Sequence, residues 1–318
     1  MKEVTLLPHN EEAYAKLVNC LKSNQLATIN HATGTGKSFI LLKYLYNNRD
    51  KKILYLAPTY PILEQLVHNH AEELGIDIRD FKCFYTMIYR TLLSLNMEEL
   101  AREYDIIVFD EYHRCGAEKW GRKAQELKEI VQANYPNKKM IGATATEIRY
   151  LDNERNMKNI LFDGVEASRL TLAEAILRGI LPAPIYINYN YDLLFEIQNL
   201  EKRVKYVFYG KEKEKYLKEI QDLKNRLENI ITTDEDIKKY LVIGKHLVFS
   251  STIENIIEDK NIVLDMLGNP DIQTYQIHSH QSKELNQKKL DEFRKAEKGI
   301  LCSVDILNEG VHVKDINS

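Results

Sequence analysis

The chain has 318 residues, enough for about two domains of ~150 residues each, and contains 44% apolar and 29% charged residues. This composition excludes fibrous and largely disordered chains and is typical of a globular protein with a buried core. The net charge of −3 argues against a protein that binds DNA through an overall positive charge of its own. It leaves room for a local basic groove.

No run reaches the ~18 apolar residues that span a bilayer, and the amino-terminal segment lacks the apolar stretch of a signal peptide. The cysteines form no Cys-x-x-Cys pair, so a zinc site is not expected. We therefore expect a cytoplasmic protein with reduced thiols. The four cysteines are Cys20, Cys83, Cys115 and Cys302.

Short apolar runs alternate with helical patterns from residue 10 to about residue 182. Such runs indicate a parallel sheet with helices on both faces. Sheets of this kind bind ligands at the carboxyl ends of their strands. The predicted strands are Leu26–Asn30, Ile53–Ala57, Phe81–Tyr85, Ile106–Phe109 and Met140–Ala143.

A glycine-rich turn, His31-Ala-Thr-Gly-Thr-Gly-Lys-Ser38, joins the first strand to a helical pattern. Backbone N–H groups and the helix N-terminus in such a turn bind phosphate oxygens. Lys37 is expected to reach the β- and γ-phosphates and Ser38 to hold Mg²⁺. His31 stands where the general pattern has its first glycine, and the alternative is a chance Gly-Lys-Ser turn. The expected nucleotide-binding residues here are Thr33, Gly34, Thr35, Gly36, Lys37 and Ser38.

The strand Ile106–Phe109 runs directly into Asp110-Glu111-Tyr112-His113. An Asp-Glu pair alone is often just a solvated loop start, but a strand of the same sheet brings it to the nucleotide edge. Asp110 is then expected to bind Mg²⁺, and Glu111 to orient or deprotonate the attacking water. The predicted catalytic residues are Glu111, Asp110, Lys37 and His113.

Two apolar series at helical spacing flank Gly210, one from Leu193 to Val207 and one from Leu217 to Ile230. Lys and Glu crowd the other positions, which is typical of two antiparallel helices with solvated outer faces. Two roles stay open for this hairpin. The favoured role is a packed structural element, and the other is an arm that binds nucleic acid or a partner.

The parallel-sheet pattern returns at His246–Ser250, Gln273–His278 and Gly299–Ser303. The sequence therefore predicts an α/β protein with two parallel-sheet lobes and a helical hairpin inserted between them. The expected boundaries are 1–185 for the first lobe with its linker, 186–241 for the hairpin and 242–318 for the second lobe.

Together, the glycine-rich turn and the Asp-Glu-Tyr-His segment resemble those of superfamily 2 helicases. The chain is most similar to the DExH-box branch that includes the motors of type I and type III restriction enzymes. The resemblance covers nearly the whole chain apart from the hairpin. It implies two RecA-like P-loop lobes, ATP and Mg²⁺ as cofactors, and nucleic acid as partner, with DNA favoured over RNA by analogy.

Further segments carry the same resemblance. Asn10 stands where the family has a glutamine that reads adenine, and Thr144-Ala145-Thr146 resembles the segment that couples ATP to nucleic acid. Ser303–His312, with Asp305 and Gly310, resembles the segment that touches both ligands. The nucleic-acid contacts implied by the resemblance are Pro58, Thr59, Thr86, Ser250 and Ser279.

The family continues beyond this last segment with a Gln…Gly-Arg…Arg segment that has no counterpart in the 318 residues. The expected second lobe is therefore incomplete. Three explanations stay open: the sequence is truncated, it is a natural fragment, or a partner chain supplies the missing elements. The implied function is an ATP-dependent DNA helicase or translocase. The alternatives are a fragment that binds ATP and nucleic acid with little hydrolysis, and a P-loop kinase or other transferase, against which Thr144-Ala145-Thr146 speaks.

Overall fold

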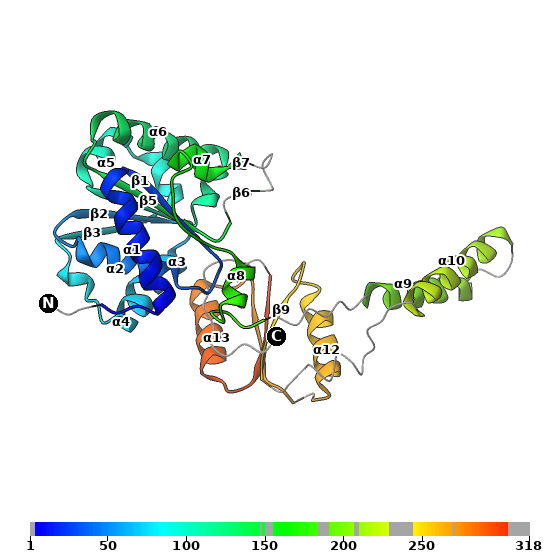
Figure 1. Cartoon of the computed structure of the whole chain (residues 1–318). Coiled ribbons are helices and arrows are strands. Elements are labelled where there is room, and N and C mark those ends of the chain that lie inside the picture. The colour runs from blue at the N-terminus through cyan, green and yellow to red at the C-terminus, as the bar shows by residue number, and fades with distance from the viewer. Residues whose placement is uncertain are drawn as a thin grey trace. The chain divides into compact units, whose positions relative to one another are not determined.

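The computed structural model describes residues 4–146, 148–149, 155–183, 191–206, 210–228, 244–269 and 271–304 (Figure 1). The chain divides into two compact units, Met1–Ala183 and Pro184–Ser318. Within the described ranges, no helix has both the length and the apolar character needed to cross a membrane.

The first unit is built on a six-stranded sheet in which every pair of neighbours is parallel, in the order β3-β2-β4-β5-β1-β8. The expectation of an α/β fold with a parallel sheet is thereby confirmed. The strands are β1 (Leu26–His31), β2 (Lys52–Ala57), β3 (Cys83–Ile88), β4 (Ile106–Asp110), β5 (Lys139–Thr144) and β8 (Glu166–Leu170).

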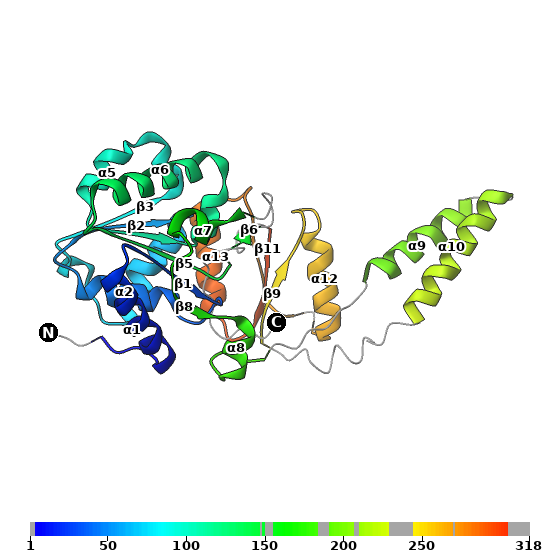
Figure 2. The ribbon, with the colours of Figure 1, turned by 45° about the horizontal axis from the view of Figure 1, so that its top comes forward.

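Helices cover both faces of this sheet, because successive strand residues point to opposite sides and the central strands β2, β4 and β5 are largely apolar (Figure 2). Tyr55 and Val108 enter one core, whereas Leu56 and Phe109 enter the other. The first core is covered by α1 (Pro8–Ser23), α2 (Lys37–Asn47), α3 (Tyr60–Glu64), a π-helical turn (Gln65–His70) and α4 (Ala71–Glu73). The second is covered by α5 (Met97–Glu103), α6 (Glu118–Asn134), α7 (Met157–Phe162) and the 3₁₀ turns Tyr89–Ser94 and Tyr112–Gly116.

Two strands differ from the sequence expectation. β3 begins at Cys83 rather than Phe81, because Phe81 closes a 3₁₀ turn (Ile78–Asp80) and packs its ring against Tyr46. β8 was not predicted at all, since Glu-Ala-Ser-Arg-Leu lacks an apolar run, as is common at a sheet edge. A segment assigned to the linker therefore pairs with β1 as the sixth strand. The first unit also contains α8 (Leu172–Leu177), which follows β8 in the chain. A separate antiparallel pair, β6 (Ile148–Arg149) and β7 (Arg155–Asn156), contacts α7 and the 3₁₀ turn Tyr112–Gly116 through β6.

The second unit contains two separate structures. The helices α9 (Tyr191–Tyr206) and α10 (Lys211–Glu228) pack side by side through Ile197, Leu200, Ile220 and Leu223. A three-stranded parallel sheet has the order β10-β11-β9, with α12 and α13 on opposite faces. Its elements are β9 (Lys245–Phe249), α12 (Ile256–Leu267), β10 (Thr274–Ile277), α13 (Lys283–Lys295) and β11 (Gly299–Ser303).

Gly142 in β5 offers a test of the packing between the sheet and α7. A Cβ at this position would lie 2.6 Å from ring carbons of Phe162 and 2.8 Å from Tyr112. Gly142→Ala should therefore lower the free energy of unfolding by roughly 1–3 kcal/mol, the usual cost of overpacking. Urea unfolding followed by Trp120 fluorescence measures this, because the single tryptophan lies in the first unit. In a Phe162→Leu background the same change should cost less, and an equal cost would contradict this account.

Candidate functional site

The glycine-rich turn lies between β1 and α2, at the carboxyl end of the first sheet. Gly34 and Gly36 have φ angles of 82° and 90°, in the left-handed region that side chains disfavour. A Cβ on Gly36 would also overlap the side-chain amide of Asn10. Gly36 is therefore required both for its backbone conformation and for the close approach of α1.

Several backbone N–H groups of this turn have no internal partner. The first residues of a helix cannot bond within the helix, and the turn itself closes only through Thr35 N to Ala32 O at 3.4 Å. A cluster of unpaired donors at a helix N-terminus favours an anion. Within the described residues, no acceptor is found for the N–H groups of Thr33, Gly34, Gly36, Lys37 and Ser38.

Two side-chain contacts to backbone oxygens of the turn help to hold it in place. The Thr35 hydroxyl donates to Ala32 O at 2.7 Å, and His9 Nε2 lies 3.0 Å from Thr35 O. Lys37 is 8% exposed, and its Nζ donates to His31 O at 3.1 Å. The same Nζ lies 4.0 Å from Glu111 Oε1, so the turn and the acidic segment after β4 meet at this lysine.

Asp110 ends β4 as a buried carboxylate. Its Oδ2 accepts a hydrogen bond from the Tyr55 hydroxyl at 2.8 Å, and its Oδ1 accepts one from Glu111 N at 3.0 Å. The hydroxyl of Tyr89 donates to the backbone oxygen of Asp110 at 2.6 Å. Burial, followed by the adjacent charge of Glu111, raises the pKa of Asp110 to about 6. A cation bound here would offset the cost of keeping this carboxylate charged.

Glu111 adopts a left-handed backbone conformation, with a φ of 48° that is uncommon for a residue other than glycine. This turn directs its carboxylate toward Lys37 and His113. Burial raises the pKa of Glu111, but the hydrogen bond from His113 and the charge of Lys37 outweigh it and leave the pKa below its ordinary value. Glu111 is therefore the more acidic member of the carboxylate pair.

A short network joins the acidic segment to the end of β5. His113 Nδ1 lies 2.8 Å from the Thr144 hydroxyl oxygen and 3.3 Å from Glu111 Oε2. The Thr144 hydroxyl is 3.0 Å from the same carboxylate oxygen and accepts a hydrogen bond from Thr146 N at 3.2 Å. A change at Glu111 can thus reach Thr146 through two hydrogen bonds.

His31, which replaces the usual first glycine, is buried at the end of β1. Its Nε2 lies 2.9 Å from the Ser168 hydroxyl of β8, and its Nδ1 finds no partner among the described atoms. Burial and then the charge of Lys37 lower the pKa of His31 to about 4. The imidazole is therefore neutral at physiological pH and connects the turn to the edge strand.

The remaining predicted nucleotide and metal residues occupy different surroundings. Asn10 is buried against Gly36, and its Oδ1 has no partner within the described chain. Ser38 is half-buried at the second position of α2. A hydroxyl and a carboxylate are oxygen ligands of the kind Mg²⁺ prefers, so Ser38 and Asp110 fit that ion. Asp305 and Gly310 lie outside the described residues.

The predicted nucleic-acid contacts differ from one another in their exposure and in their position relative to the strand ends. Pro58 and Thr59 follow β2 at the carboxyl end of the first sheet, and Thr59 is exposed. Thr86 lies within β3 and is half-buried, two residues before the strand ends. In the second unit, Ser250 is 7% exposed after β9, whereas Ser279 is exposed after β10.

Sequence reasoning missed the tyrosines that support the acidic segment. Tyr55, Tyr89 and Tyr112 are all fully buried, and each hydroxyl has a polar partner. Tyr112 donates to Asn30 Oδ1 at 2.6 Å and so connects β4 to β1. A tyrosine within an aliphatic strand, as in Ile-Leu-Tyr55-Leu-Ala, was the available signal, because a buried phenol needs a hydrogen-bond partner.

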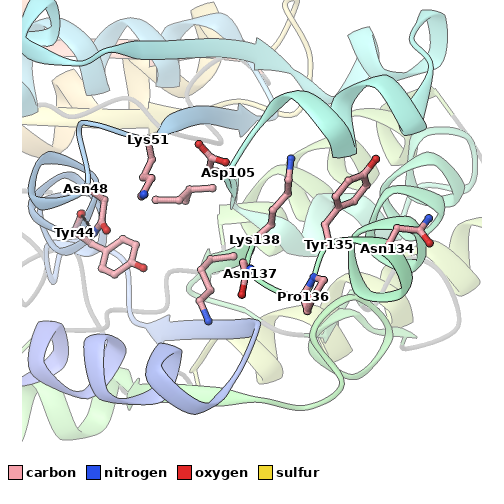
Figure 3. Close-up of a pocket in the computed structure, with 11 residues that line it drawn as sticks. Tyr44, Asn48, Lys51, Asp105, Asn134, Tyr135, Pro136, Asn137 and Lys138 are labelled. Carbon is pink, nitrogen blue, oxygen red and sulfur yellow. Dashed lines mark hydrogen bonds between the residues drawn. The ribbon is translucent and has the colours of Figure 1, made fainter.

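A pocket of about 500 Å³ lies at the opposite end of the same sheet (Figure 3). Lys51, Asp105 and Lys138, which line it, immediately precede β2, β4 and β5. Lys138 Nζ donates to Arg102 O at 2.5 Å and Lys139 Nζ to Asn24 O at 2.9 Å, so these cations are already engaged. The amino ends of parallel strands are also not where such sheets bind nucleotides.

Family models match both ends of the chain. Residues 3–84 match "Type III restriction enzyme, res subunit", and residues 225–318 match "Helicase conserved C-terminal domain". No curated protein matches the chain.

Solved structures share the fold. HrpB, a DEAH/RHA helicase of Escherichia coli, has a TM-score of 0.57 at 14% identity over 96% of this chain. LlaBIII, an ATP-dependent type ISP restriction-modification enzyme bound to DNA, has a TM-score of 0.55 at 17% identity over 98% of this chain. The chain spans 36% of the HrpB structure and 25% of the LlaBIII structure.

The buried His31 predicts a loss of stability in acid. The pKa of His31 falls from 6.5 to about 4 on folding, so its stabilising contribution is full above pH 6.5 and is lost as the pH falls through 4. At pH 5 the loss is on the order of 2 kcal/mol. His31→Gln removes this titration, so its urea midpoint, followed by Trp120 fluorescence, should fall less between pH 7 and pH 5 than that of the unmodified chain.

Asp110 changes the free energy of unfolding in the opposite direction. Its pKa is raised, so the folded state gains a proton as the pH falls toward about 6 and below, and this proton uptake stabilises the folded state. That contribution is present in both proteins and cancels in the comparison. An equal fall in the two midpoints would contradict a neutral, buried His31.

Proposed function

We propose that this chain is a superfamily 2 helicase, related to the motors of restriction enzymes, that hydrolyses ATP to move along DNA. The observation that best supports this proposal is the contact between Lys37 Nζ and Glu111 Oε1, beside a turn whose N–H donors have no acceptor among the described residues. Phosphate oxygens would accept hydrogen bonds from those N–H groups, and Lys37 would exchange its bond to His31 O for the β- and γ-phosphates.

The two carboxylates have different tasks in this proposal. Asp110, together with Ser38, would hold Mg²⁺, which when bound neutralises charge on the phosphates. Glu111, ionised and anchored by His113 and Thr144, would accept a hydrogen bond from the attacking water and take its proton as the water oxygen bonds to the γ-phosphorus. The bond from the γ-phosphorus to the bridging oxygen breaks, which leaves ADP and phosphate.

Thr144 and Thr146 would couple changes at the nucleotide site to the contacts with nucleic acid. The Thr144 hydroxyl contacts Glu111 and receives Thr146 N, so a rearrangement at the γ-phosphate alters the end of β5. Pro58 and Thr59 lie after β2 at the same edge of the sheet, which supports a nucleic-acid path along it. Residues 242–318 would supply the second lobe, with Asp305 and Gly310 toward the nucleotide and Ser250 and Ser279 toward the nucleic acid.

DNA is favoured as the substrate because the amino-terminal match is to a restriction-enzyme subunit. Grip through hydroxyls, N–H groups and a few cations would act on phosphates rather than bases. The motion would therefore be independent of sequence and weakened by salt.

The test is ATP hydrolysis by the 318-residue chain with single- and double-stranded DNA and RNA. We expect stimulation by DNA. Glu111→Gln should lower the hydrolysis rate by about 10²–10⁴-fold, the usual contribution of a general base, while ATP still binds. Lys37→Ala should lose both binding and hydrolysis. Stimulation by RNA alone would exclude the DNA assignment.

A rate that stays at the Lys37→Ala background with every nucleic acid, although ATP binds, would contradict hydrolysis by this chain alone. That outcome would favour a binding role, with the catalytic remainder supplied by another polypeptide.

A further inference from the structure

Charge is strongly segregated along the hairpin of α9 and α10. Residues 202–218, where the two helices are joined, contain seven Lys or Arg and two Glu. The remaining residues of both helices, 191–201 and 219–228, contain six acidic and two basic residues. The joined end therefore has a formal charge of +5 in a chain whose net charge is −3. We refer to residues 202–206 and 211–218 as the basic end.

Most cations of the basic end are exposed, and these have no ionic partner among the residues that the structure describes. Lys202, Arg203, Lys205, Lys215 and Lys218 are exposed. In the part of the hairpin that the structure describes, the ion pair is between Lys224 and Glu201 at 2.8 Å, outside the basic end. This pair joins α9 to α10, whereas the exposed cations of the basic end face solvent.

Helix stability accounts for only part of this arrangement. Arg203 and Lys205 lie in the last turn of α9, where the helix dipole favours cations. Lys213 lies in the first turn of α10, where the dipole disfavours them. Glu212 and Glu214 lie in the same first turn, where the dipole favours them, and Glu214 stands four residues before Lys218. These favourable positions leave the net excess of cations at the joined end unexplained.

An exposed aromatic ring stands among these charges. Tyr206 is 83% exposed beside Lys205, at the end of α9. Cations interspersed with accessible rings are typical of surfaces that bind nucleic acid, since the cations contact phosphates and a ring stacks on bases. Ile197, Leu200, Ile220 and Leu223 are buried between the two helices and are therefore not part of this surface.

We propose that the basic end of the α9–α10 hairpin is a nucleic-acid binding surface that contacts the phosphate backbone. It is separate from the strand ends of the first unit and reads no bases. The inference rests on the proposed function only in that nucleic acid is the substrate. Neutralisation of phosphates by Lys and Arg releases counterions and makes the binding depend on salt.

The test compares two triple variants of the full chain that remove the same charge. In the first, Lys205, Lys215 and Lys218 of the basic end become Gln. In the control, Lys22, Lys51 and Lys82, which precede β1, β2 and β3 at the far edge of the first sheet, become Gln. Binding to fluorescent 40-base-pair DNA and RNA duplexes is measured by anisotropy without nucleotide, across about 50–200 mM NaCl.

The basic-end variant should bind about tenfold or more weakly at low salt, and its slope of log K against log salt should fall by up to about three. The control should keep the affinity and the slope of the unmodified chain. Tyr206→Ala should weaken binding to single strands without changing the salt slope. Circular dichroism should show unchanged helix content in all of these variants, because the substituted side chains are exposed.

Equal affinity and slope in the two triple variants would overturn the proposal and would leave an acidic protein surface as the partner. Because no nucleotide is present, the result is independent of ATP hydrolysis. A chain that fails to hydrolyse ATP but loses duplex binding in the basic-end variant would refute the proposed motor function and support this surface.

Discussion

Two adjacent carboxylates buried at the end of one strand are the constraint on which the first unit depends. Asp110 and Glu111 repel each other, and burial makes both charges costly. The protein compensates with Lys37 on one side and with the Tyr55, Thr144 and His113 side chains around them. The compensation is unequal, so the pKa of Asp110 rises and that of Glu111 falls. In the proposed function, Asp110 is the metal ligand and Glu111 is the base that orients the water.

The glycine-rich turn, which places Lys37 beside these carboxylates, is held by contacts on two sides. With His31 in place of a glycine, the turn gains a side chain that must be buried, and β8 supplies Ser168 to receive it. On the other side, Asn10 of α1 packs against Gly36. The turn is therefore held between the edge strand and the first helix, and Lys37 is held by its hydrogen bond to His31 O.

The proposed DNA grip combines two kinds of contact. In this proposal, uncharged hydroxyl and N–H groups at the strand ends, such as those of Thr59, position the DNA backbone. The basic end of the hairpin would add a charged contact, which explains how a chain of net charge −3 can bind a polyanion. A structural role for the hairpin core and a binding role for its joined end are compatible, because they use different residues.

The sequence by itself determined the parallel sheet, the turn and the acidic segment, since apolar runs and the Gly-Lys-Ser and Asp-Glu motifs are local patterns. It also predicted the hairpin with Gly210 between its helices, and Gly210 has a φ of 107°. Only the tertiary structure decided that β8 pairs with β1, because a polar edge strand has no apolar run to mark it. The same holds for Tyr55 on Asp110, His31 on Ser168 and Thr144 on Glu111. These pairs join residues 33 to 137 positions apart, and only the order of strands in the sheet brings them together.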